Sequence, residues 1–304
     1  MTTRIFIDGD AGTTGLEIRE RLAGRTDIEI VALPPEKRKD PGAKRDILAG
    51  IDIAILCLPD DAAKETVALC DALGDRAPRL LDASTAHRVA PGWVYGFPEL
   101  CAGQAAAIGQ AARVANVGCY ATSSIALLRP LVDAGLIQPH QALTINAVSG
   151  YSGGGRQMIE AYEQGAAPAF ELYGLTLEHK HLPEIMAYSK LSARPLFVPS
   201  VGNFRQGMLV SIPLALDALP GQPTAADFEA AYRRHYEGAA HVRLMPAPAN
   251  GRLDALALNG TDDMELFVFA NDAYRHALLV ARQDNLGKGA SGAAVQNLDL
   301  MIGV

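Results

Sequence analysis

The chain has 304 residues, of which 49% are hydrophobic and 20% are charged, and its formal net charge is −7. This length is sufficient for more than one hydrophobic core, so we expect two domains. The acidic balance argues against nucleic-acid binding, which needs a basic face, and no segment approaches the roughly 20 consecutive apolar residues that cross a bilayer. We therefore expect a small-molecule substrate, with neither a nucleic acid nor a membrane as partner.

The first third of the chain alternates short apolar runs with helical patterns. Strands are predicted at residues 4–9, 28–33, 51–59 and 79–85, and helices at 13–22 and 60–73. Such β-α-β alternation predicts a parallel sheet with helices on both faces, as in a Rossmann-type α/β domain.

After residue 140 the strands become longer and are separated by few helices. Strands are predicted at residues 142–150, 207–216, 264–270 and 276–282, and helices at 224–238 and 289–303. This pattern predicts an α+β domain with a mixed or antiparallel sheet. We place the first domain at residues 1–117, completed by the C-terminal helix at 287–304, and the second at 118–286.

A glycine-rich turn, IDGDAGTTGLE, joins the first predicted strand to the first predicted helix. Gly9, Gly12 and Gly15 allow a tight turn and let the backbone approach a pyrophosphate at the helix N-terminus. Its place in a β-α-β run predicts a dinucleotide site, to which Thr13 and Thr14 also belong.

The residues after the second predicted strand indicate which dinucleotide binds. An NAD site usually presents a carboxylate to the ribose, whereas here Lys37, Arg38 and Lys39 follow Glu36 and can pair with a 2′-phosphate. We predict NADP as cofactor with Arg38 as a ligand, although a solvated charge run is the alternative for any one of these residues. No tyrosine has a lysine four residues later, which excludes the short-chain dehydrogenase class.

The four cysteines are Cys57, Cys70, Cys101 and Cys119. They include no Cys-x-x-Cys pair and are too few for a disulfide scaffold, and the N-terminal sequence lacks the apolar run of an export signal. We therefore expect a cytoplasmic protein whose cysteines are thiols. Cys57 lies within a strand and Cys70 on a helical stripe, where packing is the expected role.

Cys119 directly precedes a helical pattern formed by Ala121, Ile125, Leu128 and Val132. The backbone N–H groups and the dipole at a helix N-terminus favour a thiolate, and the same N–H groups can bind an oxyanion. A small buried cysteine is the alternative. We interpret Cys119 as a nucleophile.

The segment LEHKHLPEI supplies two candidates for the base that such a nucleophile needs, His179 and His181. Pro183 marks the first turn of a helix, where the dipole favours the neutral imidazole that can accept a proton. Glu184 is within helical reach of His181. The His-x-His-plus-Glu pattern also resembles part of a zinc site, but no third ligand cluster is evident and no metal is predicted.

Several motifs together resemble the N-acetyl-gamma-glutamyl-phosphate reductase family, in its shorter type 2 branch: DGDAGTTG, CLPDDAAKE, LDASTAHR, WVYGFPEL, ANVGCYAT, VSGYSGGGR and HKHLPEI. The resemblance covers nearly the whole chain. It implies an NADP-binding Rossmann domain, a second α+β domain that carries the catalytic cysteine and the oligomer contacts, and a homo-oligomer, as a dimer or tetramer.

The resemblance also implies a reaction in arginine biosynthesis. Cys119 attacks the acyl phosphate of N-acetyl-L-glutamyl 5-phosphate, phosphate leaves, and hydride from NADPH converts the thioester into N-acetyl-L-glutamate 5-semialdehyde. His181 is then the acid/base, with His179 as the second choice. The sequence departs from the family at Val117, where the motif usually has proline; valine does not fix φ as proline does, but no reacting group is lost.

The substrate is anionic, so anion-binding groups are expected in the site. The SGYSGGGR segment offers backbone N–H groups near Arg156, and Arg88 and Arg205 are further candidates, with a structural role as the alternative for Arg205. Ser84 follows a predicted strand end and is assigned to the cofactor crevice. The residues predicted to contact substrate are Arg88, Asn116, Ser149, Gly150, Arg156 and Glu184.

Three other functions are compatible with parts of this pattern. Aspartate-semialdehyde dehydrogenase uses the same thioester chemistry, but Tyr120 stands where that enzyme generally has Ser or Thr. A regulator that senses NADP(H) needs neither Cys119 nor His181, and a cysteine hydrolase needs no glycine-rich turn.

Overall fold

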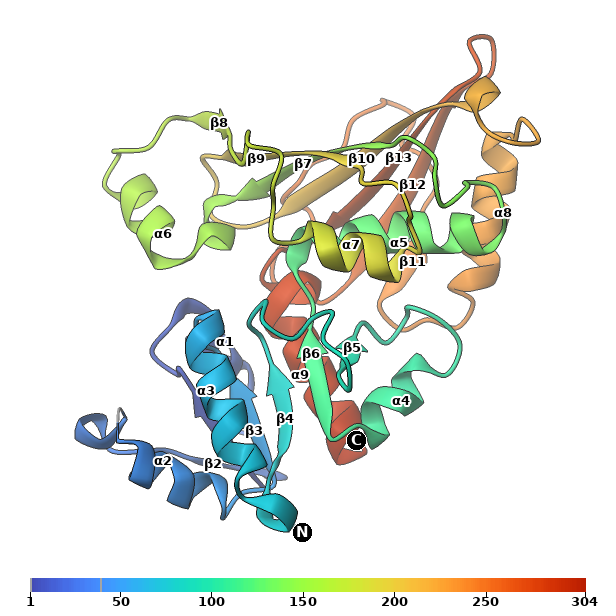
Figure 1. The fold of residues 1–304 in the computed structure, drawn as a ribbon. Coiled ribbons are helices and arrows are strands. Elements are labelled where there is room, and N and C mark those ends of the chain that lie inside the picture. The colour runs from blue at the N-terminus through green and yellow to red at the C-terminus, as the bar shows by residue number, and fades with distance from the viewer. Residues whose placement is uncertain (1, 39) are drawn as a thin grey trace. The chain divides into compact units, whose positions relative to one another are not determined.

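The computed structural model describes residues 2–38 and 40–304. The chain forms two compact units. Unit 1 consists of Met1–Pro98, Gly103–Val117 and Ala290–Val304, and unit 2 consists of Glu99–Ala102 and Gly118–Gly289. Figure 1 shows both by element and by position in the chain.

Unit 1 contains a six-stranded parallel sheet in the order β2-β1-β3-β4-β6-β5. The strands are β1 (Thr3–Asp8), β2 (Ile28–Val31), β3 (Ile53–Leu56), β4 (Arg79–Asp82), β5 (Val94–Gly96) and β6 (Arg113–Asn116). The helices are α1 (Thr13–Arg21), α2 (Pro41–Leu48), α3 (Asp60–Asp71), α4 (Gln104–Gln110) and α9 (Gly292–Ile302). After β2 the chain returns to the other side of β1, so the carboxyl ends of β1 and β3 flank a topological switch point.

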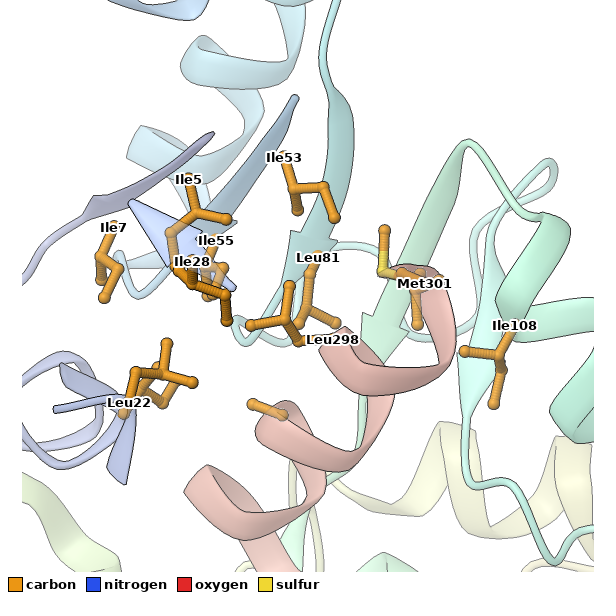
Figure 2. Packing of buried hydrophobic residues seen from close by; sticks show 13 residues of the cluster. Ile5, Ile7, Leu22, Ile28, Ile53, Ile55, Leu81, Ile108, Leu298 and Met301 are labelled. Carbon is orange, nitrogen blue, oxygen red and sulfur yellow. The ribbon is translucent and has the colours of Figure 1, made fainter. Parts of the chain in front are cut away.

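The sheet of unit 1 is buried on both faces. Ile5 and Ile55 belong to one apolar cluster, whereas Phe6 and Leu56, one residue along each strand, belong to another. This division follows from the alternation of side chains along a strand. Figure 2 shows Leu298 of α9 among the first cluster, so the C-terminal helix contributes to the core of the N-terminal strands.

Unit 2 contains a seven-stranded mixed sheet in the order β11-β12-β13-β10-β7-β9-β8. The strands are β7 (Thr144–Gly150), β8 (Phe170–Leu172), β9 (Leu196–Gly202), β10 (Met208–Ala215), β11 (Val242–Leu244), β12 (Met264–Asn271) and β13 (His276–Gln283). The helices are α5 (Cys119–Asp133), α6 (Gly155–Glu163), α7 (Leu182–Tyr188) and α8 (Ala225–His235). Only β7 with β9 and β11 with β12 pair in parallel.

The two sheets confirm the predicted fold class, a parallel α/β sheet followed by an α+β region. The strands β5, β6, β8, β9 and β11 were not predicted, and three of them have only three residues, too short for a periodic pattern. None of the helices in the described chain has the length and apolarity that crossing a bilayer requires.

Candidate active site

The glycine-rich turn connects β1 to α1 in unit 1. Gly9 has a φ of +91°, and a Cβ there would lie 2.3 Å from the carbonyl oxygen of Cys57. A Cβ on Gly15 would lie 2.4 Å from the carbonyl oxygen of Gly9. Gly12 is the N-cap of α1 and has no side chain to cap the N–H groups of the first turn, which begins at Thr13 and Thr14. The turn therefore leaves these N–H groups available for an anionic ligand.

A cavity of about 720 Å³ lies beside this turn, lined by the ends of β1 and β2 and by α2 and α3. Arg38 lines it, and its guanidinium lies 3.2 Å from the carboxylate of Asp10. The guanidinium of Arg19, from α1, lies 3.6 Å from the same carboxylate. Lys37 is exposed in the preceding turn, and Lys39 lies outside the described residues. Two arginines thus lie at one carboxylate at the edge of the cavity.

An ion pair between a buried aspartate and a half-buried lysine lies at the end of β1. The carboxylate of Asp8 is 2.8 Å from the ammonium of Lys44 in α2 and accepts a hydrogen bond of 3.0 Å from the hydroxyl of Thr66 in α3. All three residues line the cavity. Sequence reasoning missed Arg19 and Lys44, because a single charged residue on a helix gives no sign of which cavity it faces.

Ser84 lies in the turn after β4 and is buried. Its backbone N–H and hydroxyl donate to the carboxylate of Asp82, at 2.9 and 2.7 Å, and Nδ1 of His87 lies 2.6 Å from the same carboxylate. The ring of His87 stacks on Trp93, with 4.3 Å between ring centroids. The Ser84 hydroxyl therefore organises this turn, and a role for it toward the cofactor stays a prediction.

Asn116 ends β6, three residues before Cys119, and is buried. Its side-chain amide donates to the carbonyl of Ala290 and accepts from the amide of Asn297, both at 2.9 Å. Arg88, also buried, donates from Nε to the backbone carbonyl of Asn116 at 3.1 Å. These bonds fix the strand that leads to Cys119, and substrate contact by Asn116 and Arg88 stays a prediction.

Cys119 is the first residue of α5, as the sequence predicted, and is half-buried. The N-cap is Gly118, which brings no side chain to the N–H groups of this helix end. Two other cysteines have a different environment: burial raises the pKa of Cys57 to about 12 and that of Cys70 to about 11. Those two thiols stay protonated at neutral pH, so Cys119 has the better setting for a thiolate.

Glu184 contacts both the start of α5 and one of the two histidines. Its buried carboxylate accepts a hydrogen bond of 3.3 Å from the N–H of Gly118 and lies 4.0 Å from Nε2 of His181. His181 is the N-cap of α7 and is also buried, and its N–H donates to Nδ1 of His179 at 3.1 Å. Both imidazole rings lie within 6 Å of the ring of Tyr120, the residue after Cys119. The structure thus brings the predicted nucleophile's helix end, both histidines and Glu184 together.

The second glycine-rich turn follows β7. Ser149 and Gly150 are buried and, with Tyr120, line a small cavity of about 10 Å³. Arg156 lies on the first turn of α6 and is exposed. Arg205 forms an ion pair with Glu163 at 3.2 Å, the structural role weighed for it above. Ser149 and Gly150 therefore line the same small cavity as Tyr120, the residue after Cys119.

No group of three or more His, Cys, Asp or Glu side chains in residues 2–38 and 40–304 has an arrangement that could hold a metal ion. In unit 2 the candidate catalytic groups are a thiol, two imidazoles, a carboxylate and the backbone N–H groups at the start of α5. Unit 1, taken by itself, holds a candidate cofactor site formed by a glycine-rich turn and basic side chains.

Known proteins resemble the chain in sequence and in fold. Residues 119–285 match the family described as semialdehyde dehydrogenase, dimerisation domain. An N-acetyl-gamma-glutamyl-phosphate reductase 2 of Pseudomonas putida is 55% identical, with 99% of this chain and 97% of the relative covered. An N-acetyl-gamma-glutamyl-phosphate reductase of a Chelativorans species is also 55% identical, with 99% of each covered.

Solved structures share the fold at low identity. Aspartate semialdehyde dehydrogenase II of Vibrio cholerae, complexed with ASA, has a TM-score of 0.71 at 15% identity, covering 99% of this chain and 98% of that one. The Candida albicans aspartate semialdehyde dehydrogenase, solved with NADP, has a TM-score of 0.71 at 14% identity, covering 99% of each. The sequence matches are far closer than these, and they confirm the predicted resemblance: the chain belongs to the N-acetyl-gamma-glutamyl-phosphate reductase family.

Proposed function

We propose that the protein reduces N-acetyl-L-glutamyl 5-phosphate to N-acetyl-L-glutamate 5-semialdehyde and phosphate with NADPH, as a step of arginine biosynthesis. The observation that carries the proposal is the Glu184 carboxylate, which joins the N–H of Gly118, next to Cys119, to His181. A carboxylate and an imidazole thus lie beside the helix start that carries the thiol, the set of groups that an activated cysteine needs. The identity of 55% to relatives that bear the reductase name supplies the substrate.

In the proposed mechanism His181 accepts the thiol proton, and the thiolate of Cys119 attacks the acyl carbon. The bond from that carbon to the phosphate oxygen breaks, phosphate leaves with the electron pair, and a thioester remains on the sulfur. The N–H groups in the first turn of α5 hold the oxyanion that forms during this attack. NADPH, when bound, supplies the hydride that reduces the thioester. The bond from the acyl carbon to sulfur then breaks, the aldehyde is released, the electron pair stays on the sulfur, and His181 returns its proton to that sulfur.

The residues of unit 1 fit an NADP molecule. At positions 9 and 15 a Cβ would meet nearby backbone, so glycine there allows the tight turn, and the N-cap Gly12 has no side chain to cap the first N–H groups of α1, which can bind a pyrophosphate. Arg19 and Arg38 lie near Asp10 at the edge of a cavity of about 720 Å³. We assign the pyrophosphate to the N-terminus of α1 and the 2′-phosphate to the two guanidinium groups, a setting that suits NADP better than NAD.

A homo-oligomer through the sheet of unit 2 is part of the proposal. The helices α5 and α8 contact β10, β12 and β13. A cavity of about 580 Å³ lies over the same sheet, lined by residues such as Val148, Val198, Leu209, Leu278 and Val280. Val148, Val198, Leu209 and Leu278 alternate with buried side chains along their strands, so they lie on the face opposite those helices. Such an apolar face favours a second copy of the chain as its partner, in line with the matched dimerisation domain.

The proposal is tested in the reverse direction with purified protein. N-acetylglutamate semialdehyde, phosphate and NADP⁺ should yield NADPH, and aspartate semialdehyde in the same assay should not. Cys119→Ser should abolish turnover but retain NADPH binding. Turnover with the aspartate compound alone would assign the aspartate-semialdehyde activity instead, and NADPH binding without turnover of either would favour the regulator.

A further inference from the structure

The segment after β13, residues 283–289, packs directly against the first residue of α5. A Cβ on Gly289 would lie 2.7 Å from Cβ of Cys119 and 3.1 Å from its Cα. Cβ atoms essentially never approach other heavy atoms within 3.0 Å, so a side chain at position 289 would displace Cys119. Gly289 is not among the glycines with positive φ, so space rather than backbone conformation is what requires glycine here.

Gln283, the last residue of β13, holds Cys119 from another side. It is buried, and Nε2 of its amide donates a hydrogen bond of 2.8 Å to the backbone carbonyl of Cys119. A carbonyl in the first turn of a helix already accepts the regular bond from four residues later. The bond from Gln283 is therefore additional to the helix, and it attaches residue 119 to the sheet.

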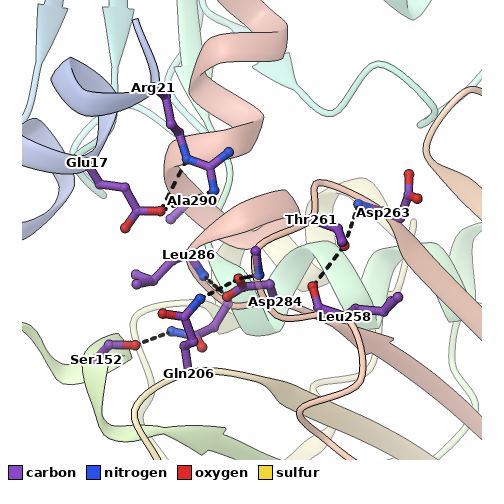
Figure 3. Close-up of polar contacts among 12 residues, drawn as sticks. Glu17, Arg21, Ser152, Gln206, Leu258, Thr261, Asp263, Asp284, Leu286 and Ala290 are labelled. Atoms are coloured by element: carbon purple, nitrogen blue, oxygen red, sulfur yellow. Dashed lines mark hydrogen bonds and ion pairs between the residues drawn. The ribbon is translucent and has the colours of Figure 1, made fainter. Parts of the chain in front are cut away.

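The backbone of the segment is itself held in place. The carboxylate of Asp284 accepts from the N–H of Leu286 at 2.9 Å and from the side-chain amide of Gln206 at 2.7 Å, two contacts seen in Figure 3. The backbone carbonyl of Asp284 accepts from the N–H of Gly289 at 3.3 Å, five residues on. This bond between residues five apart is typical of the π-helical turn Gly287–Ser291, a form that is frequent at functional sites.

A buried ion pair anchors the same turn. Nζ of Lys288 lies 2.8 Å from both carboxylate oxygens of Glu99, and Lys288 is 1% exposed. Because Lys288 directly precedes Gly289, the pair limits how far Gly289 can retreat from Cys119. An added Cβ at position 289 would therefore be relieved by movement of Cys119.

We propose that Gly289 and Gln283 are positioning residues that aim the sulfur of Cys119 at the acyl carbon. The inference rests on the proposed role of Cys119 as the nucleophile. With its Cβ against Gly289 and its carbonyl bound to Gln283, Cys119 keeps only rotation about χ1 to place the sulfur. Attack needs the reacting atoms about 3–3.5 Å apart and aligned, and a displacement of 1 Å costs about 100-fold in rate.

The first test is Gly289→Ala, with Gly50→Ala as the matched control. Gly50 has no positive φ, and a Cβ there would have its nearest neighbours at 3.8 Å. Gly289→Ala should lower kcat by about 100-fold and leave the Kd for NADPH unchanged. Alkylation of Cys119 by iodoacetamide, followed by peptide mass over a pH series, should change in rate and in pH dependence. A kcat and an alkylation profile equal to those of Gly50→Ala would overturn the proposal.

Gln283→Met keeps the side-chain volume but removes the donor, and it leaves the Cys119 carbonyl with its intrahelical partner. We expect a fall of about tenfold in kcat and an altered alkylation profile, with Gln283→Asn unable to restore either because its amide is one carbon short. If Gly289→Ala does not fold, Gln283→Met alone tests the proposal. A Gln283→Met protein with the same alkylation profile as wild type would then refute it. Alkylation needs no substrate, so the test remains valid even if the proposed reaction fails in the reverse assay.

Discussion

Replacing Asn297 by leucine tests the hydrogen bonds that hold the end of β6. Asn297 is buried in α9, and its amide donates to the carbonyl of Gly96 and to the side-chain oxygen of Asn116, both at 2.9 Å. Leucine has a similar size but no donor, so both buried acceptors lose their partner. Each such acceptor costs about 1–3 kcal/mol, but Oδ1 of Asn297 is buried with no hydrogen-bond partner among the described residues, so its removal offsets one of these costs and the free energy of unfolding should fall by about 1–3 kcal/mol.

The chain's single tryptophan makes this measurable, because Trp93 lies in the same unit as Asn297. Urea unfolding followed by Trp93 fluorescence gives the free energy of unfolding of unit 1 for each variant. Asn203→Leu, the same change at an exposed position, is the control. A loss below about 1 kcal/mol relative to that control would show that the two acceptors find other donors, and the reasoning would be wrong.

Three further predictions concern the cofactor, pH and assembly. Arg38→Ala should raise the KM for NADPH by about 10–100-fold and leave the KM for NADH nearly unchanged, because one charged hydrogen bond to the 2′-phosphate is lost. Equal effects on both cofactors would contradict the assignment of the 2′-phosphate to Arg38. Burial lowers the pKa of His235 below 6.5, so the folded state binds this proton more weakly than the unfolded state, and the free energy of unfolding should fall as the pH drops below about 6.5. The urea midpoint of His235→Gln should therefore decline less over that pH range than the midpoint of wild type. Parallel declines in the two proteins would exclude His235 as the cause. Leu278→Asp places an unpaired charge on the apolar sheet face, so light scattering should detect a smaller species than in wild type, and an unchanged mass would place the interface elsewhere.

Local pattern explains what could be predicted from the sequence. The start of α5 at Cys119 was predictable because Ala121, Ile125 and Leu128 repeat with helical spacing immediately after Gly118. The parallel sheet of unit 1 was predictable in the same way, because apolar runs alternate with helical patterns. A periodic pattern needs several residues before it repeats, so the three-residue strands β5, β8 and β11 are too short to show one.

Contacts between distant residues could not be predicted in this way. Gln283 meets the carbonyl of Cys119 across 164 positions of the chain, and only the order of the strands brings them together. Glu184 was expected to contact substrate, but its bond to the N–H of Gly118 depends on where α7 lies against α5. Periodicity reports which face of an element is buried, not which other element covers it.

The place of α9 in the core of unit 1 has a consequence for biosynthesis. Leu298 and Met301 pack with Ile5 and Ile55, but they are synthesised last in this unit. About 170 residues of unit 2 separate the two parts, and at roughly 5–20 residues per second their translation takes on the order of 10–35 s. During that interval the part of the apolar cluster that α9 completes lacks its cover, although Ile18 and Leu22 already belong to the cluster. We expect chaperones that bind nascent chains to retain this region until residues 290–304 arrive.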